Sequence, residues 1–176
     1  MPTLTAKHLL ELLTKFVDET GASVDLLLVG ALTLHAYGVS DRATRNVDAE
    51  MGGPIAPLLD YLTTHQVPAD LTQNFSGWSV VAMPPGYRDR ATDLINQENL
   101  RVRILAPIDF VIAKLRRGTD IDLDDALLVA RHYRLSADAI QSSARAALAA
   151  SPQDTTLFLF QKTVELFCKI LSAPAI

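Results

Sequence analysis

The spacing of the apolar residues changes once along the chain, close to Pro107. Before Pro107, short apolar or alternating runs bounded by glycine or proline predict strands, for example at residues 24–29 and 45–51. After it, four segments with helical spacing follow one another, some of them opened by capping residues. Strands followed by a run of helices indicate an α+β fold: a small mixed β-sheet with flanking helices, then a C-terminal helical bundle.

The same patterns place the individual elements. Helices are expected at residues 5–19, 31–37, 54–66, 107–117, 120–134, 136–150 and 152–172. Strands are expected at residues 24–29, 45–51, 69–72, 78–83 and 101–105. We therefore divide the chain into an α/β core at residues 1–106 and a C-terminal helical region at residues 107–176, packed on the core as a single compact unit.

Composition excludes several classes of protein. Hydrophobic residues make up 49 % of the 176 residues and charged residues 20 %, which does not fit a disordered chain. The longest apolar stretch, residues 26–32, is far shorter than the roughly 18 residues that a membrane span needs. The single cysteine, Cys168, cannot form an intrachain disulfide, and the four histidines lack metal-ligand spacing. We therefore expect a cytoplasmic protein without membrane contact.

The charges of the chain are unevenly distributed. The net charge of −4 argues against a generic nucleic-acid binder, a class that is usually strongly basic. Between Arg88 and Arg117, however, seven basic residues outnumber four acidic ones. A local basic surface in an acidic protein indicates a specific anion site rather than a surface that coats nucleic acid.

Residues 29–51 combine a glycine turn with a polar strand. Gly30 follows a buried strand, so a ligand can approach the backbone there, close to the N–H groups that begin the next helix. Asn46, Asp48 and Glu50 alternate with apolar residues and so project from one face of the next strand, about 6.6 Å apart. The carboxylates of Asp48 and Glu50 can share Mg²⁺ with triphosphate oxygens, which is the geometry of nucleotidyl transfer.

This stretch resembles the opening motif of the nucleotidyltransferase-fold superfamily. The most similar subfamily is the small prokaryotic DUF6036-like group, related to the nucleotidyltransferase toxins of toxin–antitoxin pairs. That group reads Gly-Gly-x-Ala-Leu, a glycine, and Arg-x-Thr-x-Asp-(Ile/Val)-Asp, which here correspond to Gly30 to Leu34, Gly38, and Arg42 to Asp48. Its later proline, acidic residue, Lys-Leu, Arg and Asp-x-x-Asp are similar to Pro107, Asp109, Lys114-Leu115, Arg116 or Arg117, and Asp122 to Asp125.

The resemblance covers about residues 24–135 and implies a nucleotidyltransferase-like fold with a role for each matching residue. The implied catalytic residues are Asp48, Glu50 and Lys114, with Asp48 and Glu50 as the Mg²⁺ ligands. The implied contacts to the nucleotide come from Gly30, Ala31, Arg42, Thr44, Asn46, Asp122 and Asp125.

Two departures from the motif keep two interpretations open. Ala31 replaces the second glycine, and Asn46 replaces the first metal carboxylate with an amide that brings no negative charge to Mg²⁺. In the first interpretation Glu50 restores the pair with Asp48, and the protein transfers NMP from an NTP to a tRNA end, a protein hydroxyl or a small molecule. In the second, the fold is catalytically degenerate and binds a nucleotide or a protein partner without turnover.

The last helix carries apolar residues on more than one stripe, as expected for a helix that is covered on several sides. These residues are Leu157, Phe158, Phe160, Val164, Phe167, Ile170 and Leu171. The helix predicts either an antitoxin-like protein partner, as in a toxin–antitoxin system, or self-association of the chain. A third interpretation, a soluble α+β domain with an accidental motif match, also stays open.

Overall fold

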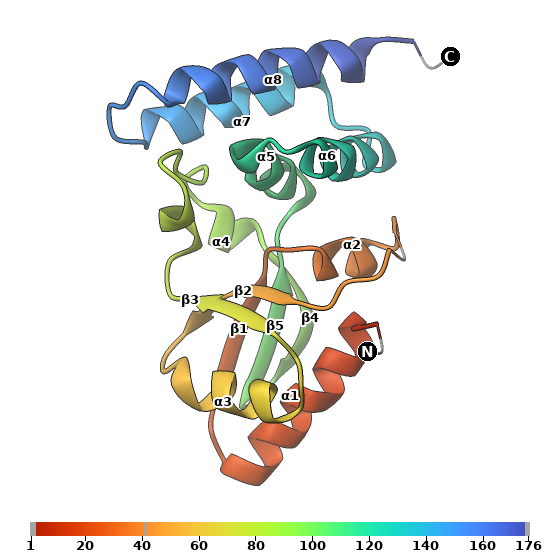
Figure 1. Cartoon of the computed structure of the whole chain (residues 1–176), viewed down its shortest axis with the longest axis vertical. Helices are drawn as coiled ribbons and strands as arrows, with labels where there is room; N and C mark the ends of the chain where they lie inside the picture. Colours follow the sequence, from red (N-terminus) through yellow and green to blue (C-terminus); the bar gives the residue numbers. More distant parts are fainter. Residues whose placement is uncertain (1–2, 41, 175–176) are drawn as a thin grey trace. The chain divides into compact units, whose positions relative to one another are not determined.

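The computed structural model describes residues 3–40 and 42–174 (Figure 1). It confirms the predicted α+β fold, with a five-stranded mixed sheet, flanking helices and a C-terminal helical region. The chain forms two compact units. The first holds the described residues up to Phe75 together with Ala91–Leu105, and the second holds Ser76–Arg90 and the described residues from Ala106 onward.

The first unit contains three helices and all five strands. The helices are α1 (Ala6–Thr20), α2 (Leu32–Tyr37) and α3 (Ala56–Thr64). The strands are β1 (Val24–Leu28), β2 (Val47–Gly52), β3 (Ala69–Thr72), β4 (Thr92–Gln97) and β5 (Leu100–Ile104). A short 3₁₀ helix, η1 (Phe75–Trp78), lies where the chain passes to the second unit.

The strands of the sheet lie in the order β3-β2-β1-β5-β4. Strand β1 pairs antiparallel with β2 and parallel with β5, β2 pairs parallel with β3, and β4 forms an antiparallel hairpin with β5. Helix α1 packs on β5 and α3 on β3, and both helices lie on the same side of the sheet (Figure 1). This leaves the opposite face for polar side chains.

Helix α1 shows why this side of the sheet is covered. Leu9, Leu13 and Phe16 are buried and lie one turn apart on one face of the helix. The Thr5 side chain accepts a hydrogen bond from the His8 N–H (3.1 Å) and so caps the first turn. Gly21 ends the helix in the left-handed conformation, with φ 68°.

The predicted strand at residues 78–83 is wrong, because this segment forms the end of η1 and a series of bends. Strand β4 was not predicted. It lies at the edge of the sheet, all of its residues are exposed or half-buried, and a register shift between Asp93 and Ile95 interrupts its alternation. An exposed edge strand lacks the apolar period of two on which a sequence prediction depends.

The second unit is made of helices. They are α4 (Tyr87–Arg90), α5 (Pro107–Arg117), α6 (Asp120–His132), α7 (Ala137–Ala149) and α8 (Leu157–Ser172). Helix α5 packs on α6, α7 and α8, and α7 and α8 lie side by side (Figure 1). Thr119 and Ser136 cap α6 and α7 through their hydroxyl groups. Helix α8 begins five residues later than predicted, at Leu157.

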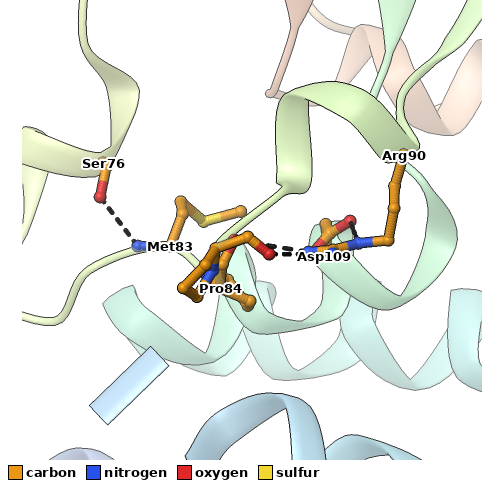
Figure 2. Close-up of polar contacts among 6 residues, drawn as sticks. Ser76, Met83, Pro84, Arg90 and Asp109 are labelled. Carbon is orange, nitrogen blue, oxygen red and sulfur yellow. Dashed lines mark hydrogen bonds and ion pairs between the residues drawn. The ribbon is translucent and has the colours of Figure 1, made fainter. Parts of the chain in front are cut away.

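Arg90 joins the segment 76–90 to this helical unit (Figure 2). Its guanidinium donates to both oxygens of Asp109 on α5, with Nε–Oδ2 at 2.9 Å and Nη2–Oδ1 at 2.8 Å. Its Nη1 also donates to the Pro85 carbonyl (2.9 Å), while the Ser76 hydroxyl accepts from the Met83 N–H (2.9 Å). The Asp109 carboxylate is fully buried, and its hydrogen bonds raise the pKa of Arg90.

Among the described helices, none combines the length and the apolar character needed to cross a bilayer.

Candidate metal and nucleotide site

Two carboxylates on neighbouring strands lie together on the polar face of the sheet. Asp48 of β2 is directly opposite Asp70 of β3, so both side chains project from the same face. The Asn46 amide nitrogen donates to Asp48 Oδ1 (2.7 Å) and to Asp70 Oδ2 (3.0 Å). One neutral amide therefore holds two carboxylates close to each other.

Gly30 makes room for the Asp48 side chain. A Cβ atom at position 30 would lie 2.4 Å from Asp48 Oδ2 and 2.7 Å from Asp48 Cβ, distances that are shorter than any stable contact. The Val29 N–H also donates to the Asp48 carbonyl (3.0 Å), which fixes the end of β1 beside β2. Gly30 therefore matters here because it has no side chain. The Asp48 carboxylate can then lie against the turn that leads to Ala31 and α2.

Glu50 lies on the same strand face as Asp48, as the alternation predicts, but it has a different environment. Its side chain is buried, and Oε2 accepts a hydrogen bond from the Phe75 N–H (2.8 Å). Through this contact Glu50 holds the chain where it leaves β3 and enters η1. The Glu50 carboxylate therefore has a structural role, and it also lies on the same strand face as Asp48.

Asp70 is the member of the site that the sequence analysis missed. The strand at residues 69–72 was predicted, but its parallel pairing with β2 was not. A pairing between strands that are 22 residues apart leaves no local pattern in the sequence. In the sequence, Asp70 is marked only as a carboxylate within a short predicted strand.

The loop before β2 is held by hydrogen bonds to its backbone carbonyl groups. Leu4 donates its N–H to the carbonyl of Thr44 (3.0 Å), and the buried Thr44 hydroxyl donates to the Asn46 carbonyl (3.4 Å). The His35 ring Nε2 donates to the Arg42 carbonyl (2.7 Å), which ties this loop to α2. Arg42 itself is exposed.

Two arginines on β5 extend the same polar face. Leu27 of β1 lies opposite Glu50 on one side and Arg103 on the other, so these side chains share a face. Arg103 forms an ion pair with Asp25 (3.2 Å), and Arg101 forms one with Asp93 (2.7 Å). The hydrogen bond from Arg101 lowers the pKa of Asp93. The face is acidic at β2 and β3 and basic at β5.

Lys114, Asp122 and Asp125 form a second cluster, inside the helical unit. The Lys114 Nζ lies 3.2 Å from Asp122 Oδ1 and 3.0 Å from Asp125 Oδ2, and all three residues are buried. Thr119 donates its hydroxyl to Asp122 (2.7 Å), and Arg117 approaches the same carboxylate to 3.3 Å. The cluster joins α5 to α6, and it belongs to a different unit from the carboxylates of β2 and β3.

The residues at the β2–β3 edge of the sheet suit a cation that binds together with a nucleotide. Among the described residues, no cluster of three or more His, Cys, Asp or Glu side chains could hold a metal ion. Asp48 and Asp70 offer two carboxylates, both within 3.0 Å of a single amide nitrogen. Mg²⁺ is commonly held by one or two carboxylates with substrate phosphates and water completing its shell. The donor set therefore fits Mg²⁺ bound as a nucleotide complex.

A family model described as a nucleotidyltransferase of unknown function, DUF6036, matches residues 7–159. The chain belongs to the DUF6036 family. The matched range includes the glycine turn, all five strands and helices α5 to α7, and it ends where α8 begins. The family match confirms the resemblance on which the site residues were assigned. No curated protein and no solved structure matches the chain significantly.

The DUF6036 description names a class of reaction without a substrate. Of the residues assigned from the DUF6036 motif, Gly30, Asn46 and Asp48 meet directly in the first unit. Lys114 meets its own motif partners in the second unit.

Proposed function

We propose that the protein is a Mg²⁺-dependent nucleotidyltransferase that moves an NMP group from an NTP to an acceptor. The observation that carries this proposal is the position of Asp48, whose carboxylate lies against Gly30 and shares the Asn46 amide with Asp70. A nucleotide phosphate at the glycine turn would lie beside the two carboxylates. Membership of the DUF6036 family supports the reaction class.

Asp48 and Asp70 would hold the cation, which when bound supplies positive charge to the transferred phosphate. Asn46 keeps both carboxylates oriented through its two hydrogen bonds. Glu50, whose side chain already holds the Phe75 N–H, supports the strand end. Such a reaction depends mainly on positioning and on electrostatic stabilisation, and no side chain has to form a covalent bond.

The phosphates themselves would be bound by the backbone and by basic side chains. The turn at Gly30 and Ala31 opens α2 and lies against the Asp48 carboxylate, and the exposed Arg42 lies in the loop tied to that helix. Lys114 keeps in this proposal the structural task that its two buried partners give it. Thr44 positions the start of β2 through the Asn46 carbonyl.

One observation favours the alternative, a degenerate fold that binds a nucleotide or a protein without turnover. The Asn46 N–H₂ group already donates to both Asp48 and Asp70, so the two carboxylates have a shared stabilising partner without a cation. In that case a nucleotide would bind equally well with and without Mg²⁺. The two functions therefore differ in their dependence on the cation.

Three classes of acceptor fit the proposed reaction. A tRNA end and a protein hydroxyl are the two macromolecular candidates, and a small molecule is the third. The net charge of −4 favours a protein hydroxyl or a small molecule as the acceptor. The two arginines of β5 keep a tRNA end among the candidates.

A transfer assay tests the proposal. Each of the four NTPs, labelled at the α-phosphate, is incubated with Mg²⁺, the protein and either total RNA or a protein extract. We expect label transfer with one of the acceptors, and its loss in Asp48→Asn. Asp93→Asn, an exposed carboxylate on the same sheet face, serves as the control and should keep activity. Nucleotide binding without Mg²⁺ and without transfer would instead establish the degenerate fold.

A further inference from the structure

Helix α8 exposes large apolar side chains. Phe158, Leu159, Leu166 and Ile170 have exposed fractions of 58, 65, 53 and 41 %. The buried residues of α8 lie on another side of the helix, which faces the rest of the helical unit. A single exposed leucine is common, whereas several on one helix mark a surface that binds another molecule.

Three of these four side chains lie on one side of the helix, while Phe158 lies apart from them, with the Lys162 ammonium 5.2 Å from its ring centroid. At 100° per residue, Leu159, Leu166 and Ile170 fall within an arc of about 40° and form one apolar stripe. Along one border of this stripe lies a charged row, which consists of Lys162, Glu165 and Lys169. The row contains both signs of charge, and Lys162 and Glu165 form an ion pair at 3.1 Å.

The stripe and the charged row complement their own reversed copy. When two α8 helices lie antiparallel about an axis close to residue 164, Leu159 of one copy lies opposite Ile170 of the other. In an antiparallel pair the charged row faces the charged row, so Lys162 of each copy lies beside Glu165 of the other. A parallel pair would instead place the charged row against the opposite border of the stripe, at Thr163 and Ile170, without an opposite charge.

We propose that the exposed face of α8 is covered by a second copy of this chain, with the two α8 helices antiparallel in a symmetric dimer. A two-fold interface requires a surface that matches itself, and the reversed pattern of apolar and charged residues has this property. The family match ends at residue 159, so two of the three stripe residues, Leu166 and Ile170, lie outside the region that the family model describes. The proposed dimer is independent of the proposed nucleotidyltransfer.

Analytical ultracentrifugation over a range of protein concentrations tests the dimer. We expect the native protein to sediment as a dimer, and Leu166→Glu to sediment as a folded monomer with an unchanged circular dichroism spectrum. Leu128→Glu is the matched control, since Leu128 is a 47 % exposed leucine on α6 and should leave the dimer intact. A native protein that stays monomeric at every concentration, or an equal effect of both variants, would overturn the proposal.

Charge reversal tests the antiparallel arrangement. In the symmetric pair, Lys162→Glu would place a glutamate beside Glu165 at both contacts between the copies. The dissociation constant of the dimer should therefore rise several-fold. The double variant Lys162→Glu/Glu165→Lys restores opposite charges and should restore dimerisation. Without this rescue, the antiparallel contact is wrong.

Cross-linking tests the register in a Cys168→Ala background. Leu159→Cys and Ile170→Cys protein should cross-link when mixed, and neither variant should cross-link with itself. Cross-linking within one variant would contradict the register.

Discussion

At the scale of single residues, the candidate site depends on a missing side chain. The Asp48 carboxylate occupies the space that a Cβ atom at position 30 would fill. The position of the Asp48 carboxylate therefore requires a glycine at position 30, although the two residues are 18 residues apart in the sequence. The site also requires the Asn46 amide, because its hydrogen bonds hold Asp70 beside Asp48.

Gly30→Ala should force the Asp48 carboxylate to move. We expect a loss of about 1–3 kcal/mol in the free energy of unfolding, the usual range for overpacking, together with weaker binding of Mg²⁺-NTP. Gly52→Ala is the control, because a Cβ atom there has no neighbour within 4 Å, and it should change stability by less than about 0.5 kcal/mol. Urea unfolding of both variants provides the comparison. Equal stabilities of the two variants would contradict the close contact.

Asn46→Asp should make the protein's stability depend on Mg²⁺. The substitution removes the donor between Asp48 and Asp70 and places a third negative charge there, which destabilises by about 1–4 kcal/mol for charges near 4 Å. Added Mg²⁺ should reverse the loss, which thermal unfolding in EDTA and in Mg²⁺ measures. Asn96→Asp, which adds a charge beside Asp93 on the exposed edge strand, should show no such Mg²⁺ effect. The same Mg²⁺ response in both variants would argue against a cation site at Asn46.

At the scale of elements, Lys114 holds α5 on α6. Lys114→Met removes the ammonium group that the buried carboxylates of Asp122 and Asp125 share, while Arg117 still approaches Asp122 at 3.3 Å. Removing one partner of a buried pair destabilises by about 3–5 kcal/mol. Lys7→Met, at an exposed lysine of α1, should stay within about 0.5 kcal/mol. Chemical denaturation distinguishes the two. A Lys114→Met protein of native stability that has lost transfer activity would show a catalytic task for Lys114 instead.

Arg90 has the corresponding task for the segment 76–90. Arg90→Ala leaves the fully buried Asp109 carboxylate without its two hydrogen bonds, and we expect a loss of about 2–3 kcal/mol. Arg101→Ala, in an ion pair with side chains 42 and 38 % exposed, should lose at most about 1 kcal/mol. Hydrogen exchange of residues 76–90 should increase in Arg90→Ala alone. Unchanged protection of this segment would contradict its attachment through Asp109.

At the scale of the whole molecule, local patterns predicted most of the secondary structure. The helices after Pro107 and the polar face of β2 follow from periodicity, and both are present. Contacts between distant segments were not predictable in this way. The pairing of β3 with β2 brings Asp70 to the site, and the Phe75 N–H donates to the carboxylate of the buried Glu50. Both depend on tertiary packing, which leaves no period in the sequence.

The residues of the proposed chemistry lie in the first unit, and the second unit has structural tasks. The carboxylates, the glycine turn and the arginines of β5 belong to the first unit, while the buried Lys114 cluster and α8 belong to the second. A loss of activity therefore needs a stability measurement beside it, since Lys114→Met and Arg90→Ala act on the packing of the helical unit.

Calorimetric titration with the four NTPs, each with and without Mg²⁺, tests the central claim most directly. We predict that the native protein binds one NTP only when Mg²⁺ is present, and that Asp48→Asn and Asp70→Asn each abolish this binding. Glu50→Gln, which keeps an oxygen acceptor for the Phe75 N–H, should retain most of it. Binding that is independent of Mg²⁺ and unaffected by Asp70→Asn would contradict a cation held between Asp48 and Asp70.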